Sequence, residues 1–213
     1  MKAVIFDMDG TIIDSREEVM GAYKHTLEAS GLEFDHAKVR KHVGRRLEDI
    51  YQSLAPGKDT EYLIRLHRSW QADNRHLLKG YHGLDEFLAD IKKLGLETGL
   101  YTSAVRTRAI AALDVLSIRE YFGAIICGDD VTKPKPHHQG VMMVADKLNV
   151  SPKDVIMVGD AEHDILAGKS AGSKTIAVTH GFGSEQSLKA AKPDKIVDNL
   201  ADLYKAIKDL VND

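Results

Sequence analysis

Six short apolar runs, separated by longer stretches of helical periodicity, constrain the fold more than any other feature of this chain. They lie at Ala3–Phe6, Glu97–Tyr101, Ala124–Cys127, Val155–Val158, Thr175–Val178 and, with a weaker pattern, Lys195–Val197. Parallel strands that are buried on both faces are almost continuously apolar, and the helices that alternate with them cover the sheet. The sequence therefore predicts an α/β protein with a doubly wound parallel sheet.

The interval between the first two runs is too long for a simple crossover. It spans about ninety residues, whereas a typical helix has only ~11–12. Four segments within it have helical patterns: Ser15–Ser30, His36–His42, Arg46–Leu54 and Thr60–Leu78. We therefore expect an all-helical domain, residues 16–80, to be inserted into a core formed by residues 1–15 and 81–213.

Two further patterns indicate where helices begin and end. Ser15 is followed three residues later by Glu18, a capping-box pattern that predicts the start of the first inserted helix. The Leu200–Val211 segment is amphipathic and predicts a helix that closes the core.

Charge and composition limit the classes of partner. The 29 Lys and Arg residues nearly balance 32 Asp and Glu residues, and no block of like charge is long enough to follow a nucleic-acid backbone. The single cysteine, Cys127, lies in an apolar run, which predicts a buried strand residue. The chain has neither a signal-like start nor an apolar run of ~18 residues. We therefore expect a cytoplasmic protein without nucleic-acid or membrane partners.

Two pairs of carboxylates follow predicted strands. Asp7 and Asp9 come directly after the first strand, where residues i and i+2 share a face, so both should point into one pocket. Asp160 and Asp164 follow a later strand, and their spacing of four predicts one helical face. Asp9 could instead belong to a simple turn, and Asp160 could be only a helix N-cap. Crowded carboxylates are typical of a site for a hard divalent cation.

Two other strand ends carry groups suited to binding an anion. Thr102 and Ser103 follow the second strand and offer hydroxyls and backbone N–H groups. Lys135 follows the third strand in a proline-rich stretch, where its ammonium could neutralise phosphate, although Lys133 is close enough to be considered instead. Taken singly, each could be an ordinary cap or surface residue.

The order of these groups resembles the haloacid dehalogenase superfamily of phosphotransferases. The matching motifs are Asp7-Met8-Asp9-Gly10-Thr11, Thr102, Lys135, and Gly159-Asp160 through Asp164. The resemblance covers the whole chain and implies a Rossmann-like core with a helical cap, as in the subfamily of phosphoglycolate phosphatases, pyrophosphatases and β-phosphoglucomutase. This chain departs from the usual pattern at Ser103, at Ala161 and in Lys135-Pro136-His137-His138.

The resemblance also implies roles for the motif residues. Asp7 would be the nucleophile that forms an aspartyl-phosphate, and Asp9 would act as general acid and then general base. Thr102 and Lys135, with Ser103 beside them, would hold the phosphoryl oxygens. The expected ligands of Mg²⁺ are the carboxylates of Asp7, Asp160 and Asp164 and the backbone carbonyl of Asp9.

The substrate should be recognised by the cap. Arg45 and Arg46, at a helix junction, are the candidates for contacting an anionic group of a small phosphorylated metabolite. Phosphoglycolate is the first expectation, with pyrophosphate or a β-phosphoglucomutase-like reaction as alternatives and a non-enzymatic phospho-acceptor module as a remote one. Asp9 disfavours dehalogenation, which needs no proton donor there. We expect a monomer or homodimer, and His163, the histidine nearest Asp164, has no assigned role.

Overall fold

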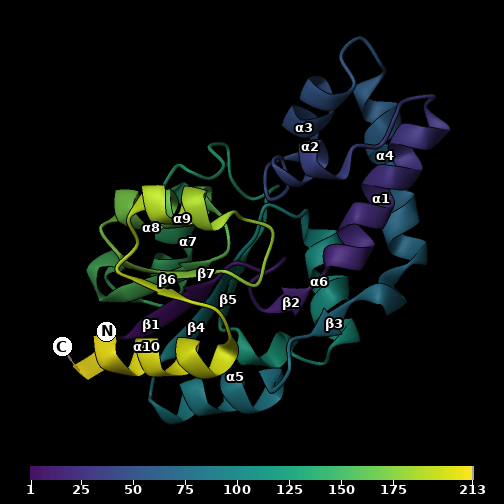
Figure 1. The fold of residues 1–213 in the computed structure, drawn as a ribbon. Coiled ribbons are helices and arrows are strands. Elements are labelled where there is room, and N and C mark those ends of the chain that lie inside the picture. Colours follow the sequence, from purple (N-terminus) through teal and green to yellow (C-terminus); the bar gives the residue numbers. More distant parts are fainter. Residues whose placement is uncertain (213) are drawn as a thin grey trace.

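A six-stranded parallel sheet forms the centre of the protein (Figure 1). The computed structural model describes residues 1–212. The strands are β1 (Ala3–Phe6), β4 (Glu97–Tyr101), β5 (Ala124–Ile126), β6 (Val155–Gly159), β7 (Lys174–Val178) and β8 (Lys195–Val197), in the order β5-β4-β1-β6-β7-β8. All neighbouring strands in this sheet run parallel. The predicted fold class is confirmed, and three predicted strand ends differ from the observed ones by a single residue.

Helices cover both faces of this sheet, which explains its continuously apolar strands. Along β1, Val4 and Phe6 pack on one side, while Ala3 and Ile5 pack on the other. The first side is covered by α5 (Leu84–Lys93), α6 (Arg106–Val115) and α10 (Leu200–Asn212). The second side is covered by α7 (Gln139–Lys147), α8 (Glu162–Ala171) and α9 (Glu185–Ala191). Figure 1 shows these two layers, with α8 and α9 opposite α10.

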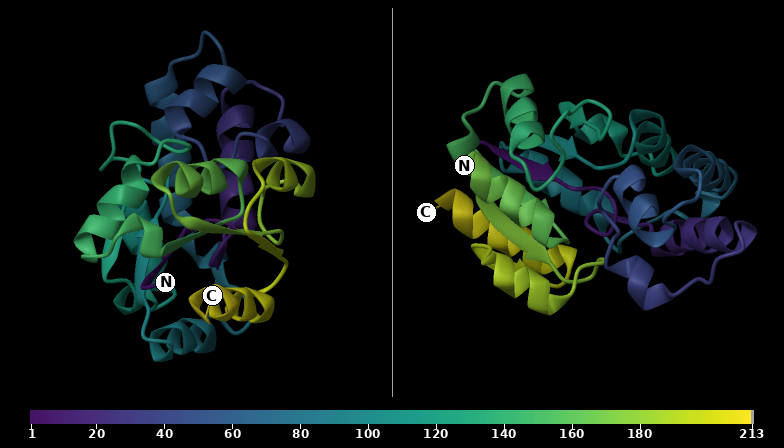
Figure 2. Two further views of the ribbon diagram at one scale, coloured as in Figure 1. Left: turned by 90° about the vertical axis from the view of Figure 1, so that its left-hand side faces the viewer. Right: turned by 90° about the horizontal axis from the view of Figure 1, so that it is seen from above.

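The inserted segment is helical and has an apolar core of its own. It contains α1 (Arg16–Ala29), α2 (His36–Arg40), α3 (Leu47–Leu54) and α4 (Thr60–Asp73), followed by the 3₁₀ turn η1 (Arg75–Leu77). Buried residues of these helices, including Tyr23, Tyr51 and Leu63, form a cluster separate from the core of the sheet. Figure 2 shows this helical unit, which we call the cap, at one end of the sheet.

Two short strands connect the cap to the core. β2 (Ile13–Asp14) and β3 (Lys79–Gly80) pair in antiparallel fashion, with Ile13 opposite Gly80. The outgoing and returning chains therefore lie side by side, and this ribbon lies next to the bounds expected for the inserted domain, residues 16 and 80. Within residues 1–212, no helix has the length and apolar character required to span a bilayer.

Two predictions about the inserted helices are wrong. The predicted helix Thr60–Leu78 ends at Asp73, because the Asn74 side chain donates to the Trp70 carbonyl oxygen at 2.8 Å and the chain continues as a 3₁₀ turn. The capping box at Ser15 does not form, although α1 starts at Arg16 as expected. The carboxylate of Glu18 turns away from the helix start and binds Arg108 of α6 instead.

Candidate active site

The carboxyl edge of the sheet brings the predicted motif residues together. Lys135, from the loop after β5, has its Nζ 2.6 Å from Asp7 Oδ1 and 2.7 Å from Asp164 Oδ1. The same ammonium donates to the Tyr101 carbonyl oxygen at 2.8 Å. Lys133 lies on the surface, so of the two lysines it is Lys135 that reaches Asp7. This convergence follows from the parallel sheet, because its strands all end at one edge.

Three buried carboxylates form a cluster beside this lysine. Oxygen atoms of Asp7, Asp160 and Asp164 lie within 4.8 Å of one another. Burial raises the pKa of Asp7 to about 7, because the repulsion from Asp164 adds to desolvation and Lys135 only partly offsets them. Burial and the neighbouring Asp7 also raise the pKa of Asp160. The cluster therefore lacks positive charge.

The donor set fits a hard divalent cation. Three ionised carboxylates against the single ammonium of Lys135 leave two negative charges, which one divalent ion would balance. Carboxylate and carbonyl oxygens are the ligands that Mg²⁺ and Ca²⁺ prefer. Desolvation by burial would raise the pKa of Asp164, but the positive charge of Lys135 and its hydrogen bond outweigh this effect. The pKa of Asp164 is therefore lowered, and the carboxylate is held ionised.

The second carboxylate pair is assembled by a turn, so the prediction of one helical face is wrong. Asp160 precedes α8, which begins at Glu162, and its Oδ2 accepts a hydrogen bond of 2.6 Å from the Phe182 N–H. Asp164 accepts from the Ala161 N–H at 3.0 Å. Gly10 packs against Asp160 with φ of +80°, and a Cβ there would lie 2.5 Å from Asp160 Oδ2. A side chain at position 10 would therefore displace the carboxylate.

Asp9 does not join the carboxylate cluster through its side chain. Its two carboxylate oxygens accept hydrogen bonds of 2.7 and 2.8 Å from Arg108 Nη1 and Nη2. Arg108 also donates to Glu18 at 2.8 Å, and Glu18 accepts a further bond from Gln71. Only the backbone carbonyl of Asp9 remains available for the predicted metal contact. Sequence reasoning missed Arg108, since it lies on α6 with no motif signal.

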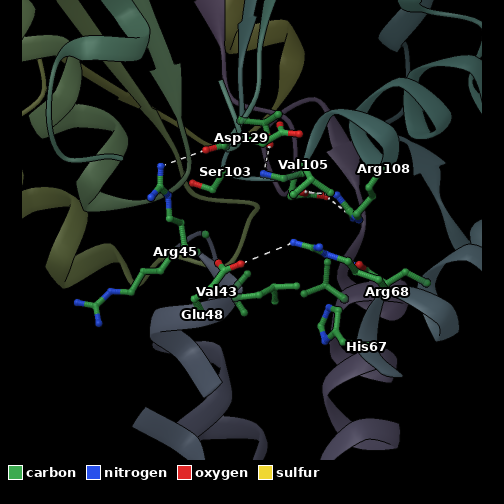
Figure 3. A pocket seen from close by; sticks show the side chains of 18 of the residues that line it. Val43, Arg45, Glu48, His67, Arg68, Ser103, Val105, Arg108 and Asp129 are labelled. Atoms are coloured by element: carbon green, nitrogen blue, oxygen red, sulfur yellow. Dashed lines mark hydrogen bonds and ion pairs between the residues drawn. The ribbon is translucent and has the colours of Figure 1, made fainter. Parts of the chain in front are cut away.

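A cavity of about 550 Å³ lies between the core and the cap (Figure 3). Its core wall includes Asp7, Asp9, Thr102, Ser103 and Arg108, and its cap wall includes Val43, Arg45, Glu48, His67 and Arg68. Thr102 is buried, and its hydroxyl oxygen accepts a hydrogen bond from the Ala104 N–H at 3.1 Å. The cavity thus places Asp7 at the boundary of a space for a small substrate.

The two arginines predicted to contact substrate have different surroundings. Arg46 donates to the carbonyl oxygens of Gly128, at 3.1 Å, and of Val131, so its guanidinium ties the cap to the core. Arg45 is exposed and lines the cavity. Among the described residues, the Arg45 side chain makes no hydrogen bond or ion pair with the core, and the substrate contacts of both arginines stay predictions.

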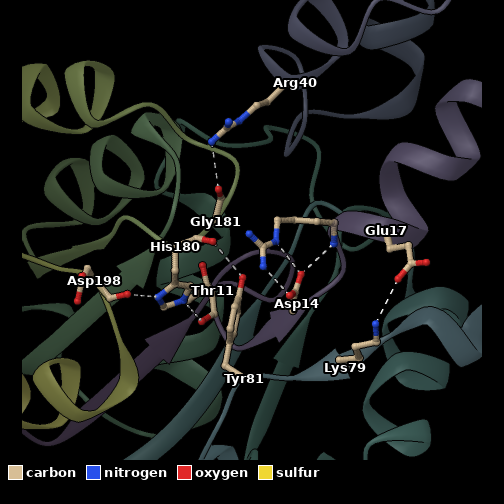
Figure 4. Close-up of polar contacts among 10 residues, drawn as sticks. Thr11, Asp14, Glu17, Arg40, Lys79, Tyr81, His180, Gly181 and Asp198 are labelled. Carbon is tan, nitrogen blue, oxygen red and sulfur yellow. Dashed lines mark hydrogen bonds and ion pairs between the residues drawn. The ribbon is translucent and has the colours of Figure 1, made fainter.

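The loop after β7 joins the carboxylate cluster to the cap (Figure 4). Arg40 of α2 donates to the Phe182 carbonyl oxygen at 2.8 Å, while the Phe182 N–H binds Asp160. The ring nitrogens of His180 contact the carbonyl oxygens of Thr11 and Asp198 at 3.0 and 2.9 Å. The loop is therefore held by the first motif and by the cap at once.

His163 lies directly beneath the cap. A Cβ on Gly44, which has φ of +91°, would lie 2.6 Å from His163 Nε2. The cap loop thus approaches the start of α8 more closely than any other residue type would permit. His163 is part of the surface on which the cap rests.

An aspartate at the end of a buried strand, beside a lysine, a threonine and two further carboxylates under a helical cap, is the arrangement of a phosphatase of the capped α/β class. Comparison with known proteins agrees. The family model of haloacid dehalogenase-like hydrolases matches residues 4–178. The chain belongs to this family.

Individual relatives match over nearly the full chain. Pyrophosphatase PpaX of Bacillus velezensis is 32% identical over 204 residues, which cover 94% of each chain. The crystal structure of a predicted phosphatase from Clostridium acetobutylicum is 27% identical, with a TM-score of 0.87 and 98% of both chains covered. A hydrolase from Pseudomonas syringae has a TM-score of 0.88, at 23% identity and 98% coverage of both, and shows the fold alone.

Proposed function

We propose that this protein is a magnesium-dependent phosphatase that hydrolyses small phosphate esters through an aspartyl-phosphate on Asp7. The observation that carries the proposal is the contact of Lys135 with Asp7 and Asp164 beside Asp160, where Asp7 borders the cavity between core and cap. A carboxylate that is positioned by a lysine next to a cation site is suited to attack phosphorus.

The reaction would proceed in two displacements at phosphorus. A carboxylate oxygen of Asp7 forms a bond to phosphorus while the bond to the leaving oxygen breaks, and Asp9 donates a proton to that oxygen. Water then attacks phosphorus, gives its proton to Asp9 and displaces Asp7, which releases phosphate. Thr102 and Lys135 would hold the phosphoryl oxygens, and Lys135 would do so by exchanging one of its three present acceptors, Asp7, Asp164 or the Tyr101 carbonyl, for a phosphoryl oxygen. Held by Asp7, Asp160 and Asp164, Mg²⁺ would neutralise charge on the phosphoryl group.

The substrate we propose first is phosphoglycolate, and the second is pyrophosphate. Four arginines, Arg45, Arg46, Arg68 and Arg108, line a cavity of about 550 Å³, which suits a small substrate with a second anionic group. The similarity to a pyrophosphatase favours the second candidate. A β-phosphoglucomutase-like reaction is the remaining alternative.

The test is phosphate release, with Mg²⁺ and with EDTA, from phosphoglycolate, pyrophosphate, sugar phosphates and nucleotides. We expect metal-dependent release from at least one of the first two, and a loss of at least about 10³-fold in Asp7→Asn. Full activity in Asp7→Asn would overturn the covalent mechanism. Conversion of β-glucose 1-phosphate to the 6-phosphate without phosphate release would identify a mutase instead.

A further inference from the structure

Arg108 is a buried cation that faces the substrate cavity between two carboxylates. Its side chain is 14% exposed, against 17% for Asp9 and 1% for Glu18. Nη1 and Nη2 bind Asp9 end-on, while Nη2 binds Glu18 at 2.8 Å and Nε approaches it at 3.4 Å. The guanidinium thus has one carboxylate partner in the cavity and one in the interior.

The two carboxylates that bind Arg108, Glu18 and Asp9, differ in how strongly the surrounding protein fixes them. Glu18 lies on α1 of the cap, is almost fully buried, and accepts a second hydrogen bond of 3.1 Å from Gln71 of α4. Asp9 borders the cavity, as does Arg108 itself. Of the two carboxylates that bind Arg108, Asp9 is therefore the one that an entering ligand can replace. Glu18 would keep Arg108 paired after the replacement, so no buried charge would be left alone.

The observed contact with Arg108 competes with proton transfer by Asp9. Both carboxylate oxygens of Asp9 accept charged hydrogen bonds, so a proton carried to the leaving group on either oxygen would weaken this pair. For the role given to Asp9 above, Arg108 has to release it. Release is costly unless another anion takes the same donors.

We propose that Arg108 recognises an anionic group on the leaving part of the substrate, and that this anion replaces Asp9 as the partner of Arg108. The proposal rests on the phosphatase function argued above and specifies its substrate class. A carboxylate or a second phosphate matches the two N–H donors that Asp9 occupies. Asp9 then becomes free to face the leaving oxygen.

A second guanidinium supports an anionic ligand at this place. Arg68 of α4 lines the opposite wall of the cavity and extends toward the same space as Arg108 (Figure 3). Its ion pair within residues 1–212 is with Glu48, at 3.8 Å, and both side chains are more than 40% exposed. Arg68 is thus free to approach an anion that Arg108 binds.

The experiment uses two substrates that differ only in this group. Phosphoglycolate carries a carboxylate where 2-hydroxyethyl phosphate carries a hydroxymethyl group. For the wild-type enzyme with Mg²⁺, we expect kcat/KM to be about 10- to 100-fold higher for phosphoglycolate than for 2-hydroxyethyl phosphate. In Arg108→Met, the preference should fall below about threefold, because the anion loses its partner while Asp9 is no longer held.

Two further variants separate recognition from folding. Arg108→Lys keeps the charge and should retain part of the preference, whereas Arg65→Met, an exposed change on α4, should retain all of it. Equal kcat/KM of the wild type for the two substrates would overturn this inference even if Arg108→Met failed to fold. An unchanged preference in Arg108→Met would also overturn it. Absence of hydrolysis of every phosphate compound tested would reject the phosphatase proposal, and this inference with it.

Discussion

Lys135 Nζ lies 2.6 Å from Asp7 Oδ1, and both side chains are buried. The ion pair joins the loop after β5 to the end of β1, and the same ammonium reaches Asp164 at 2.7 Å. One cation therefore positions the proposed nucleophile and offsets part of the charge of the carboxylate cluster. Without Lys135, the carboxylates of Asp7 and Asp164 would be buried with no charge partner on that side.

Replacement of this lysine should therefore affect stability as well as activity. Without a bound metal, we expect Lys135→Met to lower the free energy of unfolding by about 3–5 kcal/mol, the usual cost of breaking a buried ion pair. Chemical denaturation in EDTA measures this change. Lys133→Met, at the exposed lysine nearby, is the matched control and should differ from the wild type by no more than ~0.5 kcal/mol. Equal stability of the two variants would contradict the role given to Lys135.

Removal of one carboxylate from the cluster should weaken metal binding. Mg²⁺ should raise the melting temperature of the wild type, because a ligand that binds only the folded state stabilises it. We expect this increase to be strongly reduced in Asp160→Asn, since a neutral amide replaces one of three anionic oxygen donors. The exposed Asp209→Asn variant should behave like the wild type. A full Mg²⁺ effect in Asp160→Asn would place the metal elsewhere.

The contact between Gly44 and His163 predicts that cap docking depends on the glycine. Gly44 and Gly57 both have positive φ, but only at Gly44 would a Cβ meet another side chain. Alanine should cost about 1 kcal/mol of conformational strain at either position. We expect only Gly44→Ala to lower kcat/KM as well, by roughly tenfold, since the cap could no longer approach α8 as closely as it does in this structure.

The double variant Gly44→Ala with His163→Ala tests that contact directly. Truncation of the imidazole makes room for the added methyl group, so part of the lost activity should return. Steady-state kinetics of the two single variants and the double variant give the coupling between the positions. Strictly additive effects would show that the two residues act independently.

The buried His67 should make stability depend on pH. Burial lowers its pKa from 6.5 to about 3 in the folded protein, where it lies 2.7 Å from the Tyr51 hydroxyl. Below pH ~6.5 the unfolded chain takes up a proton that the folded state excludes, so His67 destabilises the fold by about 1.4 kcal/mol per pH unit as pH falls toward 3.

Urea denaturation of His67→Gln between pH 4 and 7 measures this dependence. At pH 7 the variant should be the less stable protein, because it loses the contact with Tyr51. The difference should shrink and then reverse as pH falls, since glutamine takes up no proton. His25→Gln, at an exposed histidine, should follow the wild type at every pH. Parallel curves for His67→Gln and the wild type would disprove the prediction.

Much of the fold and part of the site follow from local sequence. The apolar run Val155–Val158 predicted β6, and the observed strand extends one residue further, to Gly159. Because the parallel strands end at one edge, the convergence of Asp7, Lys135 and Asp160 could also be expected before any coordinates. Details that depend on backbone geometry could not. Asp160 and Asp164 meet across a turn, although a spacing of four is also compatible with one helical face.

The sequence alone determined the sheet, the helical insert and the order of charged groups along the catalytic edge, because these depend on short-range periodicity and on strand direction. Only the tertiary structure decided that Arg108 lies between Asp9 and Glu18, which are 99 and 90 residues away from it in the chain. It also assigned Arg46 to the carbonyl oxygens of the core and placed His163 under Gly44. These contacts form only when the cap docks on the core. The hydrophobic patterns of the cap and of the core predict the helices and strands within each domain, but not how the two domains are placed relative to each other.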